Sequence, residues 1–178
     1  MKILAAADIH GVQYRLNLLL KNISRYSPDL VVICGDTTQF GPGEVAKNFL
    51  DQIPVDTIAI TGNIDTEDVG KAISESKATN IELKKVVKKG IPFVGISGVN
   101  EEQINTFFNE NEKILDETSI LVTHVPPYET QDKIFMGKHG GSMELRNVMD
   151  KFKPRLVLCG HIHENPGVMK IEDTVIVN

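Results

Sequence analysis

The chain of 178 residues lacks several features that mark common classes of protein. It has only two cysteines, Cys34 and Cys159, and both lie in apolar runs, so two buried thiols are a simpler interpretation than a disulfide framework. No run approaches the roughly 20 apolar residues of a membrane-spanning helix, and Asp8 interrupts the apolar start too early for a secretory signal. We therefore expect a cytoplasmic protein that does not associate with membranes.

The chain also lacks an excess of basic residues. Its 19 lysines and arginines are outnumbered by 24 acidic residues, so we expect no broad surface for the backbone of a long nucleic acid. Any phosphate must then be attracted locally. The length, the 41% hydrophobic content and the absence of a linker or repeat predict one domain over residues 1–178. The sequence leaves the oligomeric state open, a homo-oligomer included.

Short apolar runs alternate with segments of helical periodicity. Strands are predicted at 2–8, 29–36, 56–63, 119–127 and 154–161, with two antiparallel strands within 80–97 and a C-terminal hairpin turning at Glu172-Asp173. Helices are predicted at 12–26, 44–53, 65–77, near 101–114 and near 142–152. This alternation predicts an α/β fold with a mostly parallel sheet covered by helices on both faces.

Polar side chains that coordinate metals or carry protons follow five of the predicted strands. They are Asp8 and His10, then Asp36, then Asn63, then His124, and finally His161 and His163. Singly, each has a plain alternative: Asp8 or Asp36 could form a turn, Asn63 could tolerate a left-handed backbone, and a lone histidine is usually not a ligand. Because ligands bind at the carboxyl ends of strands in open α/β sheets, five such ends together favour a metal site.

The donor set suggests the chemistry. It combines imidazole nitrogens, carboxylate oxygens and one amide oxygen, and its seven members are too many for one tetrahedral ion. Two ions that share a carboxylate would use them well. Such two-metal sites suit displacement at phosphorus, with a bridging hydroxide as the nucleophile. Two divalent ions, two carboxylates and one hydroxide leave a local positive charge that would attract phosphate.

The blocks "DIH", "GD", "GN", "TH" and "GHIH", in this order from Asp8 to His163, resemble the calcineurin-like metallophosphoesterase superfamily. The stretch "KHGGSMELRNVMDKFKPRLVLCGHIHE" is similar to the C-terminal half of its small, uncapped bacterial and archaeal phosphodiesterases. The resemblance implies an α/β four-layer α/β/β/α sandwich of two mixed β-sheets flanked by helices, with the antiparallel strands and the hairpin in the second sheet. It also implies ligand roles: Asp8, His10 and His163 for one ion, Asp36 as the bridge, and Asn63, His124 and His161 for the other.

The chain departs from the family pattern at one position. Many members have a histidine after Gly-Asn, which contacts phosphate and can protonate the leaving group, but this chain has Ile64. General acid catalysis typically contributes 10²–10⁴-fold. We take His139, in "GKHGGS", as a candidate replacement, with the backbone N–H groups of residues 140–142 as candidate oxyanion donors. The alternative is an ordinary solvated loop histidine.

These observations predict a metal-dependent phosphoric ester hydrolase that cleaves a small phosphodiester by attack of a metal-bridging hydroxide. The mixed nitrogen and oxygen ligands suit Mn, Fe, Zn, Co or Ni, and the resemblance favours Mn or Fe. Two alternatives remain. One is a phosphomonoesterase or nuclease using the same site, and the other is a protein-binding scaffold of the same fold with no catalysis. The scaffold is less favoured because all seven ligand positions are filled.

Overall fold

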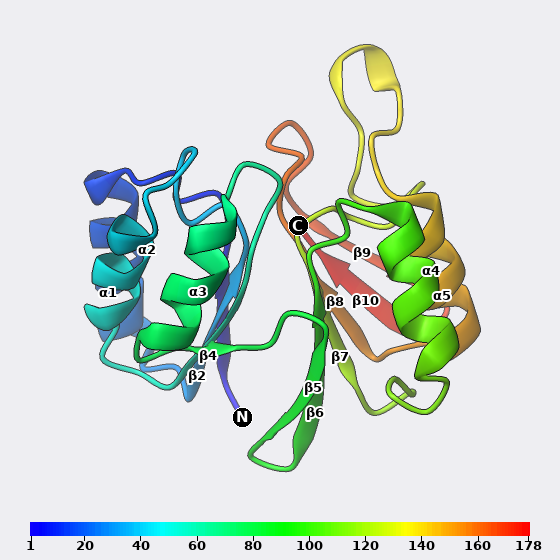
Figure 1. Cartoon of the computed structure of the whole chain (residues 1–178). Helices are drawn as coiled ribbons and strands as arrows, with labels where there is room; N and C mark the ends of the chain where they lie inside the picture. Colours follow the sequence, from blue (N-terminus) through cyan, green and yellow to red (C-terminus); the bar gives the residue numbers. More distant parts are fainter.

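Two β-sheets lie face to face in the computed structural model, which describes all 178 residues, and helices cover both outer faces (Figure 1). The first sheet is parallel, in the order β1 (Ile3–Ala6), β2 (Leu30–Cys34), β3 (Thr57–Ile60) and β4 (Thr79–Asn80). The second runs β5 (Lys84–Lys88), β6 (Ile91–Ile96), β7 (Ile120–Thr123), β8 (Leu156–Leu158), β10 (Thr174–Val177) and β9 (Val168–Ile171). It is mixed, because β5 and β9 pair antiparallel with their neighbours.

The helices form the two outer layers. The first sheet is covered by α1 (Gln13–Tyr26), α2 (Gly43–Asp51) and α3 (Glu67–Glu75), and the second by α4 (Glu101–Glu110) and α5 (Met143–Phe152). A long loop, which contains the short 3₁₀ helix η1 (Phe135–Gly137), joins β7 to α5 and projects beyond the strand ends (Figure 1). None of the helices combines the length and apolar character that crossing a bilayer requires.

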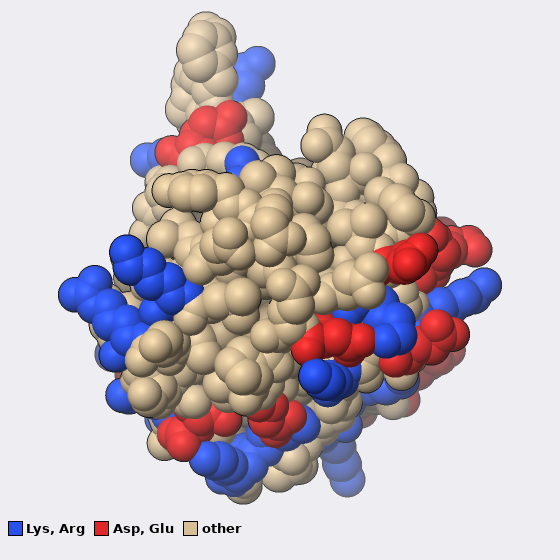
Figure 2. All heavy atoms as spheres, turned by 90° about the vertical axis from the view of Figure 1, so that its left-hand side faces the viewer, with Lys and Arg blue, Asp and Glu red and all other residues tan.

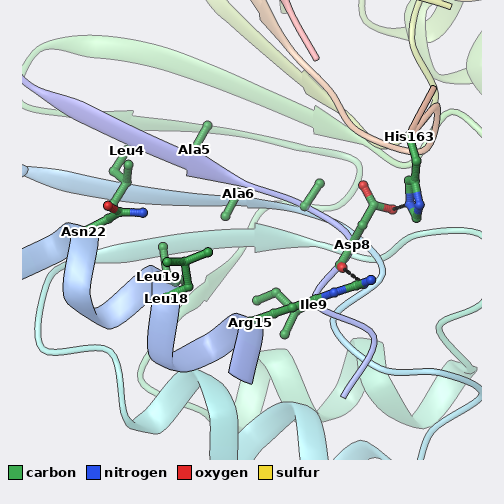
Figure 3. A pocket seen from close by; sticks show the side chains of 11 residues that line it. Leu4, Ala5, Ala6, Asp8, Ile9, Arg15, Leu18, Leu19, Asn22 and His163 are labelled. Carbon is green, nitrogen blue, oxygen red and sulfur yellow. Dashed lines mark hydrogen bonds and ion pairs between the residues drawn. The ribbon is translucent and has the colours of Figure 1, made fainter. Parts of the chain in front are cut away.

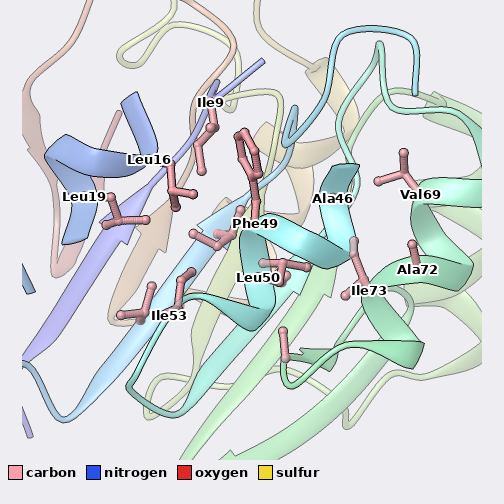
Figure 4. Close-up of a cluster of buried hydrophobic side chains, with 14 of the residues drawn as sticks. Ile9, Leu16, Leu19, Ala46, Phe49, Leu50, Ile53, Val69, Ala72 and Ile73 are labelled. Atoms are coloured by element: carbon pink, nitrogen blue, oxygen red, sulfur yellow. The ribbon is translucent and has the colours of Figure 1, made fainter. Parts of the chain in front are cut away.

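Three hydrophobic clusters fill the spaces between the four layers. In β2, Val31 and Ile33 join the cluster under α1–α3, whereas the alternate residues Leu30, Val32 and Cys34 join the cluster between the sheets. Figure 4 shows the first of these clusters, where side chains of α1, α2 and α3 meet above the sheet. Because both faces of β2 are covered, its sequence is apolar at every position, as the pattern of alternate faces requires.

The four layers implied by the family resemblance are confirmed, and only the second of the two sheets is mixed. The single sheet with helices on both faces, expected from the alternation of strands and helices, is wrong. Each sheet has helices on one face, and its other face packs on the second sheet through residues such as Ile58 and Phe93. The sequence of a strand does not distinguish these arrangements, since either kind of covering layer favours an apolar run.

Charged side chains of both signs are intermingled on the helical side of the first sheet. Figure 2 shows them concentrated toward the part of this face that lies away from the strand ends, while the part nearer the strand ends is largely uncharged. No large area of a single sign is visible on this face. This face therefore offers no extended surface of one charge to an anion.

Candidate metal centre

The predicted ligands lie where strands of both sheets end. β1, β2 and β3 of the first sheet lead to Asp8, Asp36 and Asn63, and β7 and β8 of the second lead to His124 and the final histidine pair. Asp8 (φ 58°), His10 (φ 54°), Asp36 (φ 49°) and His161 (φ 68°) all adopt a left-handed backbone. This conformation is uncommon outside glycine and gathers at functional sites. It also ends the strands earlier than their apolar runs suggest, so β1 stops at Ala6.

The first group of ligand atoms contains Asp8, His10 and His163, which come within 4.8 Å of one another. Asp8 Oδ1 lies 3.1 Å from His163 Nε2 and 3.8 Å from His10 Nε2. The other carboxylate oxygen, Oδ2, accepts a hydrogen bond from the backbone N–H of His161 at 3.1 Å. One carboxylate oxygen is thereby fixed by the backbone, and the other faces two imidazoles.

The second group contains Asp8, Asp36 and His124, also within 4.8 Å of one another. His124 Nε2 lies 2.8 Å from Asn63 Oδ1 and 3.3 Å from Asp36 Oδ2. The His161 ring lies beside that of His124, with 5.0 Å between the ring centroids. All seven predicted ligands therefore gather around two neighbouring points. Asp8 belongs to both groups, whereas the bridging role of Asp36 stays a prediction.

The second group fits a cation because three hydrogen-bond acceptors face one another, with no proton between them when the His124 ring is neutral. His124 Nδ1 lies 2.9 Å from the carbonyl oxygen of Cys34, which can only accept, so this nitrogen carries the proton. The lone pair of Nε2 in the neutral ring then faces the oxygens of Asn63 and Asp36. Three acceptors at this spacing repel one another unless a positive charge lies between them. A divalent metal ion meets that requirement, as does a proton.

The first group contains buried polar atoms that lack a hydrogen-bond partner. Asp8 Oδ1 and His10 Nδ1 are buried and have no hydrogen-bond partner. Buried polar atoms are rarely left unpaired, because the loss of water costs roughly 1–3 kcal/mol. Imidazole nitrogens and carboxylate oxygens together suit a transition metal such as Mn, Fe or Zn. The residues of each group therefore fit a metal ion.

Electrostatic interactions favour the ionised form of Asp36. Burial alone would raise the pKa of its carboxyl, but contact with the His124 imidazole and its charge outweighs burial and holds that pKa below its ordinary value. Burial lowers the pKa of His124, but the contact with Asp36 overrides it and the net direction is upward. Burial, reinforced by the charge of His124, lowers the pKa of His161. The potential around His124 Nε2 thus favours a positive charge.

Two glycines allow the carboxylates to come this close to the backbone. A Cβ atom on Gly62 would lie 2.1 Å from Asp36 Oδ1, and one on Gly160 would lie 2.8 Å from Asp8 Oδ2. Side-chain carbons do not approach other atoms this closely, so any other residue would displace the carboxylate. The glycines that precede Asn63 and His161 in the sequence therefore have a direct role in shaping the centre.

Residues 1–165 match the family model for calcineurin-like phosphoesterases. The chain belongs to this family. The uncharacterized protein MJ1162 of Methanocaldococcus jannaschii is 34% identical over 197 residues, which cover all of this chain and 87% of that protein. The probable glycerophosphodiester phosphodiesterase GpdQ of Arcobacter nitrofigilis is 27% identical, and the match covers 88% of this chain and 64% of that protein. A solved archaeal phosphodiesterase shares the fold with a TM-score of 0.54 and 16% identity, covering all of this chain and 82% of that one.

Ile64 occupies the position where many calcineurin-like phosphoesterases have a histidine, and it contacts a predicted ligand through its backbone. The N–H of Ile64 donates to Asp36 Oδ1 at 3.1 Å, so the residue still orients a predicted ligand. The following residue, Asp65, accepts hydrogen bonds from the backbone N–H groups of Thr37, Thr38 and Gly62 at 2.9–3.1 Å. Asp65 therefore ties the loop after β2 to the loop after β3. The sequence did not indicate this role, because the partners of Asp65 lie up to 28 residues away.

His139 lies on the loop between β7 and α5, and its role as a general acid stays a prediction. Its Nδ1 lies 2.7 Å from Oδ1 of the buried Asp132, and its ring packs beside that of Tyr128. It makes no hydrogen bond or ion pair with any of the seven predicted ligands. The contact with Asp132 fixes the ring orientation and leaves Nε2 directed away from that carboxylate.

The suggestion that residues 140–142 offer backbone N–H groups to an oxyanion is wrong. The N–H of Gly140 donates to the carbonyl of Asp132 at 2.9 Å, and that of Gly141 donates to the Asp132 carboxylate at 3.0 Å. The N–H of Ser142 donates to the carbonyl of Pro126 at 2.9 Å. All three donors are already used inside the protein, because this segment closes the loop and starts α5, where the Ser142 side chain caps Leu145 N–H.

Proposed function

We propose that this calcineurin-like phosphoesterase is a phosphodiesterase that acts on a small phosphodiester with two divalent metal ions. The observation that carries the proposal is the pair of ligand groups, each within 4.8 Å, which share Asp8. Each group brings imidazole nitrogens and carboxylate oxygens close together, and a metal ion bound between them would satisfy these atoms. Bound there, divalent ions would supply Lewis-acid activation of water and of the phosphoryl group.

The chain's own residues would position and neutralise the substrate. The guanidinium of Arg15 is held at the rim by a hydrogen bond of 2.6 Å to the carbonyl oxygen of Asp8, and it forms no ion pair, so its remaining N–H groups could bind a phosphoryl oxygen. We assign His139 the role of general acid, with its proton delivered from Nε2 to the leaving-group oxygen. Asp132 would act as a positioning residue, because it accepts the Nδ1 proton and orients the ring, so that the imidazolium form presents its second proton on Nε2.

A diester is favoured over a monoester because this site has Ile64 where many relatives have a histidine. Ile64 can neither donate a proton nor bind phosphate through its side chain, which disfavours esters with demanding leaving groups and a second negative charge. The names of the Arcobacter relative and of the solved archaeal structure, both phosphodiesterases, agree with this choice. A scaffold without catalysis is the weaker alternative, because a degraded site would not keep five of the seven predicted donors in two compact groups with the other two, Asn63 and His161, beside His124.

Metal binding and turnover test the proposal together. Calorimetry should find two Mn²⁺ ions per chain, and the loaded protein should hydrolyse bis(p-nitrophenyl) phosphate. Asp36→Asn should weaken Mn²⁺ binding and reduce turnover by at least about 10²-fold, while Asp173→Asn, an exposed control, should match the wild type. Two bound ions with no turnover in Mn, Fe, Zn, Co or Ni would favour the scaffold, and no bound ion would reject the metal centre.

The role of His139 has its own test. His139→Ala should reduce kcat for methyl phenyl phosphate, a diester with a poor leaving group, by about 10²–10⁴-fold. The loss on bis(p-nitrophenyl) phosphate should be much smaller, because p-nitrophenolate leaves without a proton. Asp132→Asn should move the pH profile of the poor substrate in the same experiment. Equal losses on both substrates would eliminate the general-acid role.

A further inference from the structure

A groove with a volume of about 360 Å³ runs along β1 and opens beside the candidate metal centre (Figure 3). At the metal end it is bordered by Asp8, His163 and Arg15. Its walls come from β1 and α1, and seven of its eleven lining residues are hydrophobic: Leu4, Ala5, Ala6, Ala7, Ile9, Leu18 and Leu19. The volume falls in the range of small-molecule sites. The groove therefore opens onto the candidate metal centre.

The wall formed by α1 contains an apolar residue, Leu18, that is not buried in the hydrophobic core. The helix buries Leu16, Leu19 and Ile23 against the first sheet, whereas Leu18 is 47% exposed and lines the groove. The opposite wall is β1, an edge strand, where small side chains such as Ala6 leave space. An apolar channel kept open by alanines and bordered by an exposed leucine suits an apolar ligand.

Arg15 lies where the groove meets the metal centre. Its hydrogen bond to the Asp8 carbonyl fixes the guanidinium, as Figure 3 shows, and no carboxylate neutralises it. An anion held by this cation and by the metal centre would have one substituent directed into the groove. At the other end Asn22 supplies the sole side-chain amide of the lining, and its side chain makes no hydrogen bond.

We propose that the groove binds an aliphatic arm of the phosphodiester substrate; this inference rests on the proposed function and specifies its substrate class. A nucleobase is disfavoured, because the lining has no phenylalanine, tyrosine or tryptophan for stacking and only Asn22 to pair with a base edge. The groove follows β1 from Leu4 to Ala6 and continues past Ala7 to Asp8, a span of at most roughly 13 Å. That length accommodates a chain of about eight to ten carbons.

A series of alkyl p-nitrophenyl phosphates tests the proposal. Each methylene that becomes half-buried should raise kcat/KM about twofold, so hexyl should exceed ethyl by about 16-fold, and the gain should end near decyl. Leu18→Gln, an exposed position, should reduce the hexyl-to-ethyl ratio to a few-fold. Leu83→Gln, a partly exposed leucine in a different groove, should leave that ratio as in the wild type. A ratio near one in the wild-type protein would overturn the proposal.

Binding without turnover separates this proposal from the proposed function. Octylphosphonate should bind at least about tenfold more tightly than ethylphosphonate, and it should shift the methyl NMR signals of Leu4 and Leu18 whether or not any diester is hydrolysed. Hydrolysis of bis(p-nitrophenyl) phosphate with equal binding of the two phosphonates would reject the groove and leave the phosphodiesterase standing. Sedimentation of a dimer that Leu18→Gln converts to a monomer would identify the groove as a contact between copies and would also reject the proposal.

Discussion

Replacing Gly62 by alanine is expected to weaken metal binding by about 100-fold, or about 2.7 kcal/mol, without unfolding the protein. The added Cβ atom would lie 2.1 Å from Asp36 Oδ1 and 2.5 Å from Asp36 N. Real Cβ atoms stay at least 3.0 Å from other heavy atoms, so the carboxylate must move by about 0.9 Å, the difference between 3.0 and 2.1 Å, and the backbone nitrogen of Asp36 by about 0.5 Å, the difference between 3.0 and 2.5 Å. Metal–ligand distances tolerate only about 0.2 Å, so Asp36 would no longer serve as a ligand.

Gly70→Ala provides the matched control. Gly70 lies in α3, and a Cβ atom there would meet nothing closer than 3.6 Å. This substitution should bind Mn²⁺ as the wild type does and should stabilise the helix by about 0.5–1 kcal/mol. Titration calorimetry with Mn²⁺ gives the affinities, and urea unfolding followed by circular dichroism establishes that both variants fold. If folded Gly62→Ala bound Mn²⁺ as tightly as the control, Asp36 would not be a ligand in the position described.

Stability measurements test two other features. Asp29 accepts hydrogen bonds from Lys89 Nζ at 2.6 Å and from the Lys2 backbone N–H at 2.7 Å, and these lower the pKa of its carboxyl to about 2. Because this pKa is lower in the folded state, the interaction stabilises the protein above about pH 4 and its contribution disappears as the pH falls toward 2. Calorimetry should therefore find Asp29→Asn less stable than the wild type at pH 6, with a gap that closes toward pH 2; a constant gap would refute the assignment. In urea unfolding, Phe93→Ala should cost about 3–5 kcal/mol, because Phe93 is fully buried between the sheets. Phe135→Ala, at a position 81% exposed, should change the free energy of unfolding by less than about 0.5 kcal/mol, and similar losses at both positions would contradict the described core.

The sequence alone predicted most elements because burial imposes a simple pattern on strands and helices. The strand 29–36 is observed at Leu30–Cys34, and the predicted turn at Glu172-Asp173 separates β9 from β10. The spatial gathering of the seven predicted ligands was predictable for the same reason, since each follows a buried strand. The division into two sheets required the family resemblance, because an apolar strand is compatible with either kind of covering layer.

Residues that act through long-range hydrogen bonds were harder to predict. Asp65 and Asp132 each bind several N–H donors, and nothing in their local sequence specifies those partners. The same limitation produced the wrong assignment at residues 140–142. Glycine-rich segments before a helix often bind anions, but here the buried carboxylate of Asp132 takes up the Gly141 donor. A local motif indicates which donors exist, and only the fold determines which of them remain free.

The candidate centre spans the seam between the two sheets. One side supplies Asp8, His10, Asp36 and Asn63, and the other supplies His124, His161 and His163. Neither half of the molecule could therefore retain both ions by itself. Ion binding would link the two sheets at the end where the strands stop. When metal is scarce, that end of the seam would be held by apolar contacts and by a few hydrogen bonds, such as those from His124 Nδ1 to the Cys34 carbonyl and from the His161 N–H to Asp8.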